Sequence, residues 1–162
     1  MVASLTVRVN TGSNASTESA AVSGIDFISD DNAINTLGNR QAYPITVGNR
    51  SYEKWLTLKI DTIPANAISN VQIWGDGGVT TSTTLYFTGD YATGTTPVST
   101  ASSVADTVFD SYTSSAKATW DAGPYTDTND VTDFAVFQLD VAATANPGNW
   151  PQETISYSYD ET

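Results

Sequence analysis

The sequence predicts an all-β protein, a single antiparallel β-sandwich of jelly-roll or immunoglobulin-like type with about eight or nine strands and little or no helix. Three observations support this fold class. Hydrophobic residues alternate with polar ones in seven short segments, clusters of turn-forming residues separate the segments, and no segment carries a convincing helical stripe. The length of 162 residues suits one domain covering residues 1–162.

The first four strands are predicted in the N-terminal two thirds of the chain. Their apolar positions are Leu5, Val7 and Val9; Leu56, Leu58 and Ile60; Val71 and Ile73; and Leu85 and Phe87. Successive side chains of a strand point to opposite faces, so each segment is expected to be half-buried. Segments 25–28 and 43–47 are weaker strand candidates.

Three further strands are predicted near the C-terminus. Their apolar positions are Ala116, Ala118 and Trp120; Phe137, Leu139 and Val141; and Ile155, Tyr157 and Tyr159. The last strand is either paired inside the sandwich or an edge available to a neighbour. Segment 102–109 is predicted to be a loop or one short helical turn, because its serines and threonines favour neither a helix nor a strand.

The glycine-rich stretch WGDGG, residues 74–78, raises the question of a ligand loop. A phosphate loop needs a longer glycine pattern, a following lysine and a helix, which this stretch lacks. Asp-Gly between two strand patterns instead predicts a hairpin turn joining strands 70–74 and 83–88. Trp74 is expected on the face opposite Val71 and Ile73, where it either caps the sheet edge or is exposed for a partner.

The absence of cysteine and histidine excludes several kinds of chemistry. Disulfides, thiolate metal sites, Ser-His-Asp catalysis and nearly every zinc or iron site require these residues. Paired carboxylates can hydrolyse glycosides without them, but no spacing among the 18 acidic residues identifies a pair. We therefore predict no enzyme activity, no catalytic residue and no cofactor.

The net charge of −12 is unevenly distributed. Such a surface repels nucleic acid and anionic lipid, so neither is an expected partner. Residues 106–162 contain ten acids and one base, Lys117, whereas residues 38–59 contain four bases and one acid. The four bases are Arg40, Arg50, Lys54 and Lys59. This basic segment is either a docking place for an acidic partner or a set of scattered solvating charges.

The stretch DTNDVTD, residues 127–133, offers oxygen ligands from Asp127, Asn129, Asp130 and Asp133. Oxygen ligands at alternate positions can bind calcium, but the glycine and the distant glutamate of an EF-hand loop are missing. The alternative is a solvated acidic turn before the next strand. No metal site is predicted, although the sequence leaves calcium at this turn open.

Targeting signals are not evident. The N-terminal residues contain no basic region followed by an apolar run, and no window approaches 18 apolar residues. We expect synthesis in a cytoplasm without a signal peptide, and no membrane span.

Four segments carry a resemblance to a known group of proteins. They are SYEKWLTLKI, ISNVQIWGDGG, TTSTTLYFTGDYATGTTPVSTASSVA and the C-terminal PQETISYSYDET. Together they resemble small all-β virion structural proteins of tailed bacteriophages. The resemblance covers most of residues 51–104 and 134–162, and it does not extend to residues 1–50 or 105–133.

The resemblance implies a capsid decoration or cement protein that binds the major capsid protein on the outer surface of the virion. Combined with the basic segment, it makes Arg40, Arg50, Tyr52 and Lys54 candidate capsid-binding residues. Trp74 and Tyr86 are candidate contacts in a homo-oligomer, for which a trimer is expected, or with another partner. The alternative is a tail, neck or fibre component that binds a host surface glycan through exposed aromatic residues.

Overall fold

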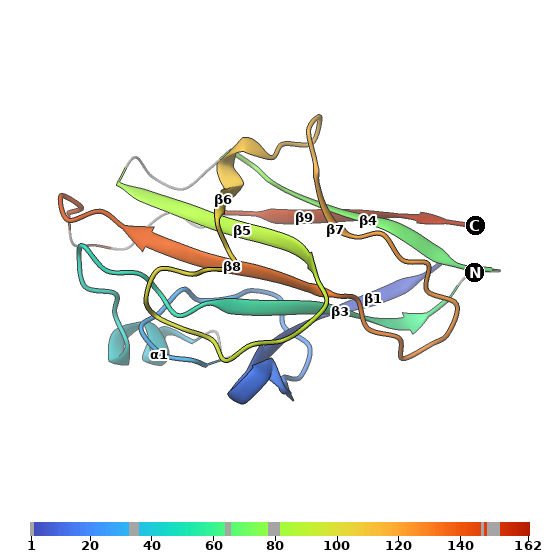
Figure 1. Ribbon diagram of the computed structural model, residues 1–162, viewed down its shortest axis with the longest axis horizontal. Coiled ribbons are helices and arrows are strands. Elements are labelled where there is room, and N and C mark those ends of the chain that lie inside the picture. The colour runs from blue at the N-terminus through green and yellow to red at the C-terminus, as the bar shows by residue number, and fades with distance from the viewer. Residues whose placement is uncertain (1, 33–35, 64–65, 78–81, 147, 149–152) are drawn as a thin grey trace.

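In a computed structural model the chain forms two antiparallel β-sheets packed face to face (Figure 1). The structure describes residues 2–32, 36–63, 66–77, 82–146, 148 and 153–162. The prediction of an all-β, sandwich-like fold with nine strands and little helix is confirmed.

The larger sheet has six strands and the smaller has three. The order in the larger sheet is β2 (Thr17–Glu18), β1 (Ser4–Thr11), β3 (Lys54–Thr62), β8 (Phe134–Val141), β5 (Thr83–Tyr91) and β6 (Thr107–Val108). The order in the smaller sheet is β7 (Ala118–Asp121), β4 (Ile68–Gly75) and β9 (Ile155–Glu161). The helical elements are α1 (Leu37–Ala42) and two 3-10 turns, η1 (Ser13–Ala15) and η2 (Phe109–Ser111).

The main core lies between the two sheets and contains the alternating apolar residues of both. Its centre is an aromatic cluster of Phe87, Phe109 and Phe137, whose ring centroids are 5.0 to 5.3 Å apart. Val71, Ile73 and Trp120 of the smaller sheet complete this core from the other side. The period-two pattern therefore selected the residues that face the core.

A second cluster covers the outer face of the larger sheet. It contains Trp55, Val136, Val104, Ala105 and Ala15. Loop residues from 92–106 and η1 thus bury the side of β3 and β8 that was predicted to face water. The prediction of half-buried strands is wrong for these two central strands, because each is buried on both faces along most of its length.

The predicted hairpin between β4 and β5 is also wrong. β4 pairs with β7 and β9, whereas β5 pairs with β6 and β8 in the other sheet. Asp76 and Gly77 form a bend, and Gly78 lies outside the described residues. The WGDGG stretch therefore begins a crossing from one sheet to the other. A Cβ at Gly75 would meet the carboxylate of Glu153, so that side chain would have to move to admit a larger residue.

The weak strand candidates 25–28 and 43–47 do not form strands, and α1 lies between them. Thr36 begins this helix, with its hydroxyl accepting a hydrogen bond from the N–H of Asn39 at 3.2 Å. Segment 102–109 is mostly loop, as predicted. It contains the two-residue β6 and reaches η2 at Phe109.

Candidate functional site

Lys54 is buried at the start of β3, with 1% of its surface exposed. Its ammonium donates hydrogen bonds to the carbonyls of Asp30 and Asn32, at 3.2 and 2.8 Å. Burial lowers the pKa of Lys54 to about 8, against the opposing effect of the carboxylates of Asp31, Asp30 and Asp26. Lys54 therefore stabilises a loop of its own chain and has almost no exposed surface, while its role in capsid binding stays a prediction.

Arg50 also contacts its own chain. Its guanidinium lies 2.9 Å from the carboxylate of Asp140, donates to Gln138 at 3.3 Å and stands 4.8 Å above the ring centre of Tyr86. Arg50 and Tyr86, predicted on two different surfaces, are therefore in contact. The arginine stacks on a tyrosine in the outer layer of the larger sheet.

Arg40 and Tyr52, the other two predicted capsid-binding residues, have different environments from Arg50 and Lys54. Arg40 belongs to α1, keeps 52% of its side chain exposed and forms a 3.0 Å ion pair with Asp26. Tyr52 is half-buried, and its N–H donates to the carbonyl of Ile28 at 2.9 Å. Of the four predicted capsid-binding residues, Arg40 retains the most accessible charge.

Trp74 lies on the outer face of the smaller sheet, as its register predicts. Its neighbours Val71 and Ile73 are fully buried on the opposite face. The ammonium of Lys117 stands 4.4 Å from the centre of the Trp74 ring and donates to the hydroxyl of Ser158 at 3.0 Å. Trp74 is therefore half-buried beneath a lysine.

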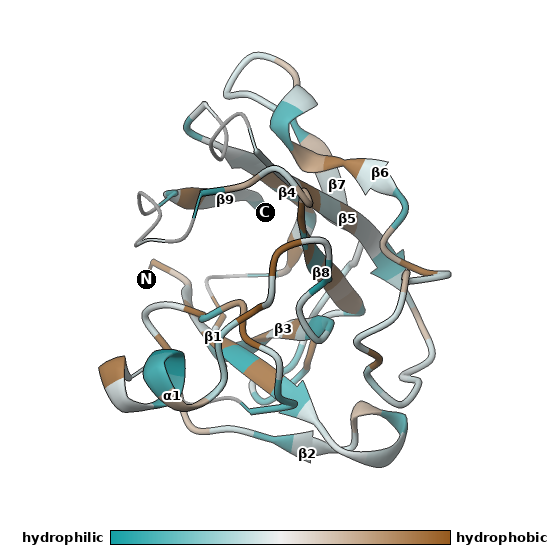
Figure 2. Cartoon of the chain, turned by 90° about the vertical axis from the view of Figure 1, so that its left-hand side faces the viewer, coloured by the Kyte–Doolittle hydropathy of each residue, from teal (hydrophilic) through white to brown (hydrophobic). Residues whose placement is uncertain are grey.

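Three exposed apolar side chains lie within or just after α1. We call residues 36–49 the α1 surface. None of the six helical residues is buried, and Leu37, Tyr43 and Val47 are 59%, 40% and 41% exposed. The helix lies at the periphery of the molecule (Figure 2). No acidic residue occurs from 32 to 52, and the one charged residue of this surface, Arg40, is paired with Asp26. Sequence reasoning found the charge but missed the helix, because a six-residue helix leaves no periodic signal.

The acidic turn at 127–130 is closed by its own hydrogen bonds. The N–H of Asp127 donates to the Asp130 carboxylate at 3.2 Å, and the N–H of Asp130 points back to the Asp127 carbonyl at 3.4 Å. Asn129 has a φ of 73°, a conformation that asparagine tolerates well. Asp133 does not share this turn, so the four proposed calcium ligands are not brought together.

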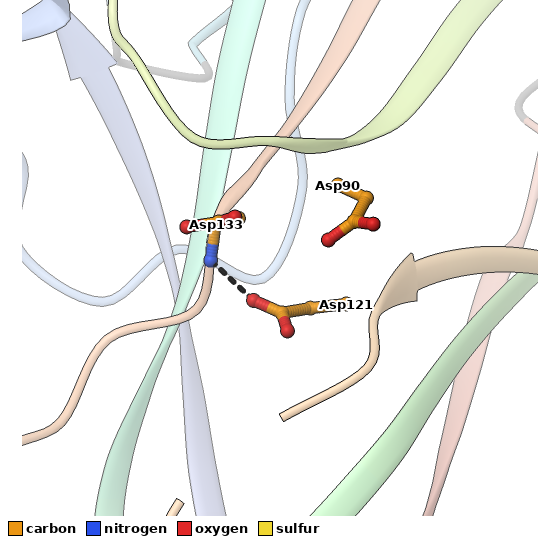
Figure 3. Close-up of side chains that lie close together, drawn as sticks. All are labelled: Asp90, Asp121 and Asp133. Atoms are coloured by element: carbon orange, nitrogen blue, oxygen red, sulfur yellow. Dashed lines mark hydrogen bonds between the residues drawn. The ribbon is translucent and has the colours of Figure 1, made fainter. Parts of the chain in front are cut away.

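Asp133 instead meets Asp90 of β5 and Asp121 of β7 (Figure 3). One carboxylate oxygen from each lies within 4.8 Å of the others. Burial raises the pKa of Asp133, and the charges of Asp121 and Asp90 raise it further. The sequence gave no signal for this cluster, because its members come from separate segments that only the fold brings together.

The hydrogen bonds of Asp121 limit what this cluster can do. Asp121 accepts from the N–H of Gly123 at 2.7 Å, from the N–H of Asp133 at 2.5 Å and from the Tyr125 hydroxyl. Three carboxylates are suitable donors for a hard cation, but calcium needs roughly six to eight oxygens. Since both oxygens of Asp121 already accept hydrogen bonds, its evident role is to connect β7 to the segment before β8.

An open hollow of about 310 Å³ adjoins this cluster through Asp90. Phe87 and Tyr112 supply its aromatic part, and threonines of β5, β6 and β7 supply polar groups. Gly89 is required beside it, because a Cβ there would collide with the carbonyl oxygen of Thr119. The hollow therefore marks the close approach of β5 and β7, where the two sheets meet.

Comparisons with protein-family models, curated proteins and solved structures found no match for this chain. Among the described residues, no helix is long and apolar enough to cross a membrane.

Replacing Lys54 by methionine is expected to change how stability depends on pH. A folded-state pKa of about 8, below the ordinary 10.5, makes the folded protein release this proton first. Wild-type stability should therefore rise relative to Lys54→Met between pH 8 and 10.5, by up to about 3 kcal/mol. Urea unfolding at several pH values measures this difference. Lys59→Met, on the same strand, is the control. If the unfolding free energies of the wild type and Lys54→Met changed equally with pH, the lowered pKa of Lys54 would be contradicted.

Replacing Asp133 by asparagine is expected to stabilise the protein at neutral pH. Because its folded-state pKa is raised, the ionised carboxylate of Asp133 disfavours folding, and stability is lost as the pH rises through that pKa. Asp133→Asn should melt a few degrees higher at pH 7, and the gain should disappear below pH 3.8. Thermal melts in EDTA test this effect without a cation, and Asp76→Asn is the exposed control. A lower melting temperature at pH 7 would mean that the carboxylate stabilises the fold.

Proposed function

We propose that this protein is a non-enzymatic virion structural protein, a decoration or cement protein that binds the outside of a phage capsid. The main observation that supports this proposal is the α1 surface. It is an exposed segment with three accessible apolar side chains and no acidic residue, on a chain of net charge −12, and these features suit a docking surface. The resemblance of the four segments to virion proteins supplies the identity of the partner, the major capsid protein.

The α1 surface has features that a docked partner would explain. A six-residue helix is too short to be stable by itself, and this helix buries none of its own residues. Leu37, Tyr43 and Val47 would lose their contact with water on docking, and each Å² of apolar surface so buried contributes roughly 25 cal/mol. The expected partner surface is apolar with carboxylates at its rim, which would face Arg40.

The charge of the rest of the molecule favours the outer side of a capsid. Residues 106–162 carry a net charge of −9, which would be repelled by packaged DNA and would keep particles apart in solution. Decoration also favours a homo-oligomer, such as the trimer expected from the sequence, because several weak contacts acting together hold a subunit firmly.

Introducing a charge on the α1 surface should weaken particle binding without unfolding the protein. Leu37→Glu is expected to reduce binding to purified capsids at least tenfold, because it places a carboxylate in the apolar contact and faces acidic groups of the partner. Co-sedimentation with particles measures the bound fraction. Val131→Glu, which alters an apolar residue 40% exposed elsewhere on the surface, is the matched control. Equal binding of both variants would exclude the α1 surface as the dock.

The copy number in purified particles tests the proposed function as a whole. Quantitative mass spectrometry against the major capsid protein should give a ratio near one, or one copy per few shell subunits. A ratio matching a tail or neck ring would favour the alternative, a tail, neck or fibre component that binds a host glycan. Absence from particles would overturn both readings.

A further inference from the structure

The four sheet edges differ greatly in length. Three of them are short: β2 and β6 have two residues each, and β7 has four. β9 has seven, and within the described chain it pairs with β4 alone. Short edge strands are one way in which proteins prevent unwanted pairing. β9 is the edge that lacks this protection (Figure 2).

β9 also lacks proline, basic residues and a bulge, which protect many edge strands. It contains no proline, lysine or arginine, and residues 154–159 are uncharged. The pairing of β9 with β4 is irregular at one place. Ser69 pairs with Asp160 and Gln72 pairs with Ser158, so β4 advances three residues there while β9 advances two. The extra residue therefore bulges from β4, and β9 keeps the regular spacing that pairing on its free edge requires.

We propose that β9 pairs antiparallel with β9 of a second copy, about a two-fold axis that passes at Ser158. The two three-stranded sheets then join into one six-stranded sheet across the dimer. Ser158 faces itself, and Tyr157 of one copy faces Tyr159 of the other. Aromatic cross-strand pairs of this kind stabilise sheets. The contact is isologous and closes with two copies, so a trimer would need a different surface.

The charges of the chain favour this register over the one centred at Tyr157. With the axis at Ser158, Asp160 lies opposite Ser156 and Glu161 lies opposite Ile155, so no two acids face each other. With the axis moved to Tyr157, Glu153 would lie opposite Glu161. Like charges directly opposite destabilise an antiparallel pair.

Lys117 adds a favourable contact in the same register. It lies on the outer face of the smaller sheet, bound to Ser158, and it is the one base of residues 106–162. Asp160 of the second copy arrives on that same outer face, opposite Ser156. The lysine then lies near an acid of the other subunit.

Overall charge opposes the association, since each copy carries −12. Salt screens this repulsion, so the dimer should strengthen as ionic strength rises. A single pair of strands makes a small interface, for which a dissociation constant on the order of micromolar is expected. The contact shares no residue with the α1 surface and does not depend on binding to a capsid.

Sedimentation of the whole chain from about 1 to 100 µM, the range suited to a small interface, tests the proposal. As the concentration rises, the apparent mass of the wild type should increase from that of a monomer to that of a dimer. Ser158→Asn, which adds no charge, should show the same change. Ser158→Asp should weaken the dimer at least tenfold, because two carboxylates would face each other across the axis. In the monomer that carboxylate meets Lys117, so folding should be unaffected, and thermal melts check this. A wild type that stays monomeric, or a Ser158→Asp variant that dimerises like the wild type, would overturn the proposal.

The absence of cysteine allows a second test of the register. Opposed residues of an antiparallel pair are close enough for a disulfide, with Cα atoms about 4.5 to 5.5 Å apart. Ser158→Cys should therefore form a covalent dimer on mild oxidation. Thr119→Cys, exposed on β7 of the same sheet, controls for chance collisions. Equal cross-linking of the two variants would contradict a pairing centred at Ser158.

Discussion

The fully buried side chain of Gln138 holds the outer layer of the larger sheet together. Its amide nitrogen donates to the carbonyls of Ser51, Val98 and Thr100, and its oxygen accepts from the N–H of Ser102. A buried amide without partners would cost more free energy than the hydrogen bonds contribute, so this position requires the loop 92–106 to lie over the sheet. Glu53 adds a second tie to that loop through the N–H of Val98 and the hydroxyl of Ser102.

This covering decides which surfaces remain available to partners. With loop 92–106 and η1 packed on one face of β3 and β8 and the smaller sheet on the other, the centre of the larger sheet is closed on both sides. The accessible features are then peripheral. Among the described residues they include the α1 surface, which buries none of its own helical residues, and the outer edge of β9, which pairs there with β4 alone. The two proposals use these two surfaces, one for a partner and one for a second copy.

Most of the basic residues are engaged in holding the fold. Arg50 pairs with Asp140, Lys54 binds two loop carbonyls, and Lys117 lies against Trp74. Arg8 pairs with Glu18 at 3.9 Å. Because few positive charges are left unmatched at the surface, the exterior is governed by the acidic residues. That favours a role in which the molecule repels nucleic acid and its neighbours everywhere except at its docking surfaces.

The sequence by itself determined the seven strands of four or more residues, because side-chain alternation depends only on neighbours along the chain. It gave no signal for the two-residue β2 and β6. Leu85 and Phe87 faced the core as predicted, and Trp74 faced away from it. Only the tertiary structure decided how the strands pair, which separated β4 from β5 and made β9 an edge. It also decided the environment of each charge: Lys54 became buried and Asp133 met two distant aspartates. The physical reason is that pairing, burial and electrostatics depend on residues remote in sequence, and local patterns carry no record of them.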